Sequence, residues 1–78
     1  MYVIITRDNC SYCEKAKALM QAHKLQYVVY NVQSTSSKWL LDLIKKAGYT
    51  TVPQVWNPEG KHIGGYDQLH QLLTEGPL

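Results

Sequence analysis

The spacing of the apolar positions changes several times along this chain, and each change predicts a new element. The run Tyr2–Thr6 (YVIIT) is rich in β-branched residues and shows no polar alternation, which is typical of a short buried strand. The polar residues RDN then interrupt the pattern and could cap a helix. From Cys10 to about His23 the apolar residues recur every three or four positions, which predicts an amphipathic helix.

A second strand and a second helix follow. Leu25–Val32 (LQYVVYNV) predicts the strand, and the polar stretch Gln33–Ser37 predicts a loop in which Ser36 or Ser37 could cap the next helix. The segment KWLLDLIKKAG then places four apolar residues on one helical face: Leu40, Leu43, Ile44 and Ala47. Gly48 is suited to end this helix.

The last part of the chain predicts a hairpin and a final helix. VPQVWNPEGKHIGG contains two short strand-like runs around Asn57–Gly60, where Pro58 and Gly60 suit a type I turn. Tyr66–Leu73 then predicts a short helix. The resulting order is β-α-β-α-β-β-α, so the first two strands should be parallel and the last two antiparallel. We expect an α/β fold, a small mixed four-stranded sheet flanked by helices.

Length and charge narrow the class of protein. Seventy-eight residues predict one domain spanning residues 1–78. A net charge of +2, with scattered basic residues, does not indicate a nucleic-acid partner. No apolar run approaches the roughly 20 residues of a membrane span, and Met1 is followed directly by apolar residues rather than by a signal peptide's basic region. We therefore expect a soluble, cytosolic protein without a membrane partner.

Both cysteines of the chain, Cys10 and Cys13, stand at the start of the first predicted helix. The partial positive charge of a helix N-terminus favours a thiolate, so the pKa of Cys10 should fall well below its ordinary value, and Arg7 could add positive charge. Cys13 lies one turn further along the same face, where it should be more buried and within bonding reach of Cys10. We therefore expect Cys10 to attack a disulfide and Cys13 to resolve the intermediate.

Two other uses of the cysteine pair stay open. The cysteines could be inert core residues, although a C-x-x-C between a strand and a helix is a specific context for redox chemistry. They could also form half of a zinc site, but zinc usually takes four protein ligands and the chain has no second cysteine pair. The histidines His23, His62 and His70 lack the usual zinc-ligand spacing, and each is better interpreted as a surface residue. We predict no metal site.

Two further stretches carry candidate binding chemistry. In Thr50–Val55 (TTVPQV), a cis Val52–Pro53 bond would expose the Val52 backbone for pairing with an extended thiol peptide. The alternative is an ordinary trans proline that opens an edge strand. In GGYDQL, the two glycines allow close approach of the backbone, and Asp67 could cap the helix or accept a hydrogen bond from an α-amino group.

The three stretches CSYC, TVPQV and GGYDQL, in this order and at these separations, resemble glutaredoxins. The resemblance covers essentially the whole chain, and PQVWNPEGKHIGGYDQL is most similar to the small dithiol glutaredoxins of T4-like bacteriophages. It implies a thioredoxin-like fold with Pro53 in the cis form beside the active cysteines. It also implies reduction of protein disulfides and of glutathione mixed disulfides, with glutathione as the electron source.

The resemblance also implies roles for individual residues. Cys10 is the nucleophile that takes up glutathione, and Cys13 resolves, so that the two form a redox-active disulfide. In the implied glutathione site, Arg7 is the basic residue near the glycine carboxylate, and Tyr12 lies beside the sulfur. The backbone platform for the cysteinyl unit is Thr51, Val52 and Pro53. The stretch that holds the γ-glutamyl end is Gly65, Tyr66, Asp67 and Gln68.

This chain departs from the family's commonest pattern at two positions. Ser11 replaces a proline, and its hydroxyl could donate to the Cys10 thiolate and shift the redox balance. Some glutaredoxins with serine at this place assemble a [2Fe–2S] cluster between two subunits with two glutathiones. Gln68 stands where many relatives carry a carboxylate, so Asp67 would take over the γ-glutamyl amine and glutathione could bind less tightly.

Three functional hypotheses follow. The first is a glutathione-dependent oxidoreductase, which acts as a monomer on disulfide proteins such as ribonucleotide reductase, in the host cytoplasm if the chain is encoded by a phage. The second is an iron–sulfur carrier or sensor, and the third is a thioredoxin-like protein served by a flavoprotein thioredoxin reductase.

Overall fold

The computed structural model describes residues 1–34, 38–49 and 51–74. The elements in these ranges are β1 (Tyr2–Thr6), α1 (Ser11–Ala22), β2 (Tyr27–Asn31), α2 (Lys38–Lys46), β3 (Gln54–Trp56), β4 (His62–Gly64) and α3 (Tyr66–Thr74). They follow the predicted order. The predicted caps Ser36 and Ser37 lie outside the described residues, as does Thr50.

The second strand begins later than the predicted Leu25. Lys24 adopts a positive φ of 57°, and the Leu25 amide donates to the carbonyl of Met20 at 3.0 Å. Both features belong to the C-terminal closure of α1. The chain can therefore enter the sheet only at Tyr27.

The four strands form one mixed sheet in the order β2-β1-β3-β4. β1 pairs in parallel with β2, as predicted, and antiparallel with β3. β3 and β4 form the predicted antiparallel hairpin. The turn of this hairpin closes with a hydrogen bond of 2.9 Å from the Gly60 amide to the Asn57 carbonyl. The predicted turn at Asn57–Gly60 is therefore confirmed.

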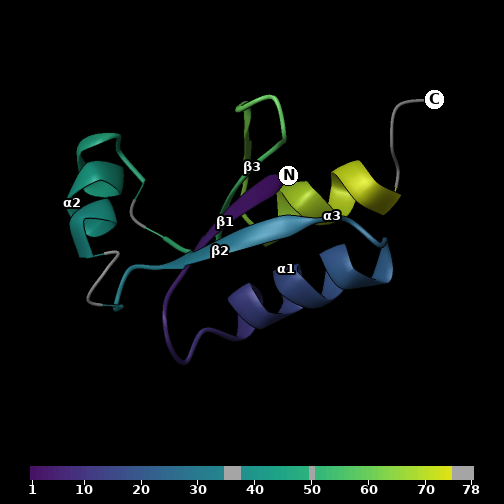
Figure 1. The fold of residues 1–78 in the computed structure, drawn as a ribbon, viewed down its shortest axis with the longest axis horizontal. Helices are drawn as coiled ribbons and strands as arrows, with labels where there is room; N and C mark the ends of the chain where they lie inside the picture. The colour runs from purple at the N-terminus through teal and green to yellow at the C-terminus, as the bar shows by residue number, and fades with distance from the viewer. Residues whose placement is uncertain (35–37, 50, 75–78) are drawn as a thin grey trace.

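Neighbouring side chains of β1 serve two separate cores because they point to opposite faces of the sheet. Ile4 packs with residues of α1, β3 and α3, namely Ala16, Met20, Val55 and Leu69. Ile5 packs with Val32 and with Leu40 and Ile44 of α2. Figure 1 shows α1 and α3 close together and α2 well apart from both, so the sheet lies between helices.

The predicted apolar face of α2 is only partly correct. Leu40 and Ile44 are buried, but Leu43 is 54% exposed and Ala47 is exposed too. The buried pair lies at i and i+4, so both side chains project from the same side of the helix.

The sheet register brings the three motif stretches to one end of the molecule. Ile5 pairs with Gln54 and Val55 pairs with Gly64, both antiparallel. The residues that follow β1, precede β3 and follow β4 must therefore meet at the same end of the sheet.

Candidate active site

Cys10 is the N-cap residue of α1, with extended backbone angles, and its Sγ accepts a hydrogen bond from the Cys13 amide at 3.2 Å. The preceding Asn9 has a φ of 53°, a conformation that asparagine tolerates better than most residues, and it turns the chain from β1 into the helix. The predicted position of Cys10 at the mouth of the helix is therefore confirmed.

A disulfide joins Cys10 and Cys13, whose Cα atoms lie 5.2 Å apart. Cys13 has 0% relative exposure, whereas Cys10 is partly exposed. The two sulfurs are thus chemically unequal, because only Cys10 can be approached from outside. This is the asymmetry that the sequence predicted for an attacking and a resolving cysteine.

The loop before β3 faces the disulfide. The Val52–Pro53 peptide bond is cis, so the cis alternative is correct and the trans alternative is wrong. The Val52 carbonyl oxygen lies 3.8 Å from Cys10 Sγ, while Pro53 is buried. A backbone carbonyl thus stands beside the accessible sulfur.

A buried glutamine ties this loop to the hairpin. Gln54 is 6% exposed, and its Nε2 donates to the Thr51 carbonyl at 2.9 Å. Its Oε1 lies 2.7 Å from His62 Nε2, and because an amide oxygen only accepts, His62 is the donor. The His62 ring also packs against Tyr49 and Trp56, with centroids 4.4 and 4.9 Å apart.

The interpretation of His62 as a surface residue is therefore wrong, and its link to Gln54 was missed. The available signal was Gln54 itself, a polar residue between apolar neighbours in a predicted strand. A buried amide requires hydrogen-bond partners, and the facing strand of the hairpin is where such a partner is expected. His23 is exposed, as predicted.

The start of α3 is closed by Gln68 rather than by Asp67. The Gly65 amide donates to Gln68 Oε1 at 2.9 Å, the reciprocal half of a capping box. Asp67 stands in the first helical turn and is exposed, and no group within the described residues donates to its carboxylate. The Asp67 carboxylate is therefore available to a ligand, whereas the side-chain oxygen of Gln68 is already engaged by the Gly65 amide.

A pocket of about 460 Å³ opens between these stretches. Its lining residues are Tyr12, Thr51, Val52, Pro53, Gln54, Gly65, Tyr66, Asp67 and Gln68. The structure thus brings together the whole predicted glutathione set except Arg7, which lies with Cys10 in a neighbouring pocket. The 3.8 Å contact between Cys10 Sγ and the Val52 carbonyl links the two pockets.

One wall of the 460 Å³ pocket is aromatic. The rings of Tyr12 and Tyr66 have centroids 5.9 Å apart, and Lys15 Nζ lies 4.8 Å from the centroid of Tyr12. Tyr12 is more than half exposed despite these contacts. An accessible ring next to the cysteine pair can cover an incoming ligand.

Within residues 1–34, 38–49 and 51–74, no group of three His, Cys, Asp or Glu side chains is placed to hold a metal ion. A cluster shared between two chains would use Cys10 alone from each, because Cys13 is buried. That hypothesis stays a prediction. None of the described helices has the length and apolar character needed to cross a membrane.

The chain is similar to known proteins over nearly all its length. A family model described as Glutaredoxin matches residues 2–63. Glutaredoxin 3 of Escherichia coli strain K12 is 36% identical over 75 residues, which cover 96% of this chain and 88% of that protein. The glutaredoxin of Enterobacteria phage T4 is 34% identical, with 83% of this chain and 85% of that protein covered.

A solved structure shows the same fold. The crystal structure of a buckwheat glutaredoxin–glutathione complex aligns with a TM-score of 0.80 at 28% sequence identity. The alignment covers 96% of this chain and 69% of the buckwheat chain. The expected thioredoxin-like architecture is thus confirmed.

Proposed function

This chain belongs to the glutaredoxin family, and from that premise we propose that it is a glutathione-dependent thiol–disulfide oxidoreductase acting through Cys10 and Cys13. The observation that carries the proposal is the placement of Cys10. Its sulfur is accessible, lies at the N-terminus of α1 and faces the Val52 carbonyl, whereas Cys13 is fully buried. A nucleophile and a protected resolving thiol are what disulfide exchange requires.

The helix supplies the activation of Cys10. In the reduced protein, the Cys13 amide that donates to Cys10 Sγ would donate to a thiolate, and hydrogen bonds to an ionised acceptor are the stronger ones. The partial positive charge at the helix N-terminus acts in the same direction. Both effects favour the thiolate form of Cys10, which is the nucleophile in disulfide exchange.

The reaction follows from the unequal sulfurs. The Cys10 thiolate attacks one sulfur of a substrate disulfide, and the other sulfur leaves as a thiolate that takes a proton from solvent. Cys13 then loses its proton and attacks the Cys10 sulfur, which releases the second substrate thiol and forms the Cys10–Cys13 disulfide. Two glutathione molecules return this disulfide to the dithiol and leave as glutathione disulfide.

Glutathione would lie along the pocket lined by the predicted residues. Binding of glutathione is supported by the similar buckwheat glutaredoxin, whose structure is a glutathione complex. The backbone of Val52 would pair with the cysteinyl unit of glutathione, and the free carboxylate of Asp67 would accept from the γ-glutamyl amine. Arg7 would attract the glycine carboxylate from the neighbouring pocket that it shares with Cys10. Gln68 contributes through the fold, since its side-chain oxygen is bonded to Gly65.

We extend the proposal to the setting of the reaction. A reducing cytoplasm keeps the dithiol form available, and a monomer suffices because both cysteines belong to one chain. We propose ribonucleotide reductase as one protein substrate, as the resemblance to phage glutaredoxins implies. Reduction of that enzyme's disulfide by this protein would test the assignment directly.

The decisive experiment is the reduction of a small glutathione mixed disulfide, with glutathione and glutathione reductase as the recycling system. We expect activity in the wild type and in Cys13→Ser, and none in Cys10→Ser. If the first two proteins are inactive with glutathione while the wild type turns over with thioredoxin reductase, the glutathione-dependent proposal is wrong and the thioredoxin-like hypothesis takes its place.

A further inference from the structure

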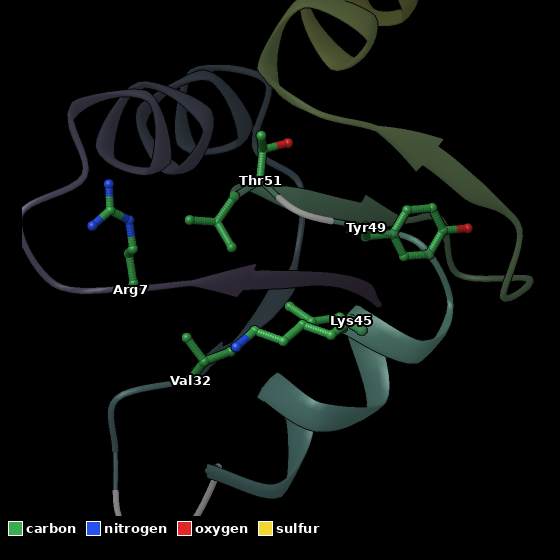
Figure 2. A pocket seen from close by; sticks show the side chains of 7 residues that line it. Arg7, Val32, Lys45, Tyr49 and Thr51 are labelled. Carbon is green, nitrogen blue, oxygen red and sulfur yellow. The ribbon is translucent and has the colours of Figure 1, made fainter.

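Besides the proposed glutathione pocket and the pocket that holds Arg7 and Cys10, a third pocket of about 450 Å³ borders the cis-proline loop. Its lining residues are Arg7, Val32, Ile44, Lys45, Tyr49, Thr51 and Val52 (Figure 2). It shares Thr51 and Val52 with the proposed glutathione pocket, so the two adjoin across the backbone that faces Cys10. Its volume lies in the range of small-ligand sites, and it can accept a large side chain.

The walls of this pocket are apolar and its charges are all positive. Val32, Ile44 and Val52 supply aliphatic surface, and Tyr49 supplies an aromatic ring. Figure 2 shows Arg7 on the β1 side of the pocket and Lys45 extending from α2 in the direction of Val32.

Arg7 and Lys45 both lack a counter-ion among the residues that the structure describes. Among the described lining residues none is acidic, and in the described part of the chain no carboxylate forms an ion pair with Arg7 or Lys45. An apolar pocket with unpaired cations at its margin suits a ligand that carries an apolar group next to a negative charge.

The direction of a bound substrate decides which part of it reaches this pocket. In the proposed orientation of glutathione, the γ-glutamyl unit on the amino side of the cysteine lies towards Asp67, and the glycine on its carboxyl side lies towards Arg7. Because Arg7 lines the third pocket as well as the one around Cys10, a protein substrate paired with Val52 in the same direction places the residues after its cysteine beside the third pocket. Glycine has no side chain, so glutathione itself leaves the apolar walls uncovered.

We propose that this pocket selects protein substrates in which the attacked cysteine is followed by a large apolar residue and then by an acidic one. This inference rests on the proposed disulfide exchange and adds a substrate class to it. The apolar side chain covers Val32 and Ile44, and the acidic group lies near Lys45 and Arg7. Lys45 thereby acts in substrate recognition, in addition to its favourable position in the last turn of α2.

The test uses short symmetric peptide disulfides and single-turnover kinetics. The protein is reduced beforehand and freed of reductant, so the release of peptide thiol measures exchange without glutathione. Three amidated peptides are compared, containing Cys-Leu-Glu, Cys-Gly-Glu and Cys-Leu-Lys. We expect the Leu-Glu peptide to react at least about tenfold faster than the Gly-Glu peptide, because even one methylene in an apolar pocket discriminates by about that factor.

A matched pair of variants tests the charge. Lys45→Gln should slow the Leu-Glu peptide about two- to fivefold at low salt and leave the Leu-Lys peptide unaffected or faster. Lys46→Gln is the control, because Lys46 occupies the same helical turn but does not line the pocket. Added salt should reduce the Lys45 effect, as expected for an exposed charge.

Two results would overturn the inference: equal rates for the Leu-Glu and Gly-Glu peptides, or equal effects of the two lysine substitutions. The reduction of the small glutathione mixed disulfide, run in parallel, reports on the proposed function alone. Normal turnover of that substrate without any peptide preference refutes the pocket's role and leaves the proposed function standing.

Discussion

The link between His62 and Gln54 allows a prediction with a defined magnitude. The substitution His62→Phe keeps an aromatic ring against Tyr49 and Trp56 but removes the donor that Gln54 Oε1 accepts at 2.7 Å. Gln54 is 6% exposed, so water cannot readily replace the lost donor. A buried acceptor left without a partner costs about 1–3 kcal/mol.

The free energy of unfolding in urea measures this cost on the oxidised protein. For a domain of this size, each 1 kcal/mol corresponds to a fall of about 4–8 °C in the melting temperature. The matched control is His23→Phe, at an exposed histidine that ends α1, where we expect less than about 0.5 kcal/mol. The double variant with Gln54→Leu should recover part of the loss, because both partners are then apolar.

The same substitution should also affect catalysis. Gln54 holds the Thr51 carbonyl directly before the loop that faces Cys10, so an untethered Gln54 loosens that loop. We expect kcat/KM for the small glutathione mixed disulfide to fall several-fold. A His62→Phe protein as stable as the His23→Phe control, with unchanged kcat/KM, would refute the reasoning for both effects.

Three further predictions concern the glycines, the ligand carboxylate and the iron–sulfur hypothesis. Gly64→Ala should destabilise by about 1–3 kcal/mol in urea unfolding, because Gly64 has a φ of +127° and the new Cβ would lie 2.9 Å from the side chain of Gln68. Gly48→Ala, with positive φ but open space, should cost less, and the reverse order would contradict the packing argument. Asp67→Asn should raise KM for glutathione several-fold with kcat little changed, since in the proposed site its charge would meet the γ-glutamyl amine in both ground and transition states; an unchanged KM would exclude that contact. Anaerobic reconstitution with iron, sulfide and glutathione should give a coloured protein that requires Cys10 if the cluster hypothesis holds, and a colourless product would count against it.

The element order was predictable because it depends on local periodicity. The run Tyr2–Thr6 became β1 with the predicted bounds, and the turn at Asn57–Gly60 formed as its residues indicate. The prediction that Leu43 packs against the sheet was wrong. Helical spacing defines which residues share a face, but not how much of that face a small sheet covers.

The assembly of the candidate site was harder to predict from local sequence patterns. Cys10, Val52 and Asp67 are brought together by antiparallel register, in which Ile5 pairs with Gln54, and register depends on contacts distant in sequence. Their predicted association came from the family resemblance rather than from periodicity. The capping by Gln68 and the donation by His62 follow from side-chain directions that only the assembled fold defines.

The complete burial of Cys13 has a consequence for survival under oxidative stress. Of the two cysteines, only Cys10 can be reached by peroxide, which would convert it to a sulfenic acid. Cys13 lies within bonding distance and would condense with it, forming the disulfide and releasing water before the irreversible sulfinic acid appears. Mass spectrometry after peroxide treatment should therefore find sulfinic acid in Cys13→Ser but a disulfide in the wild type, so the thiol that completes each turnover would also preserve the nucleophile between turnovers.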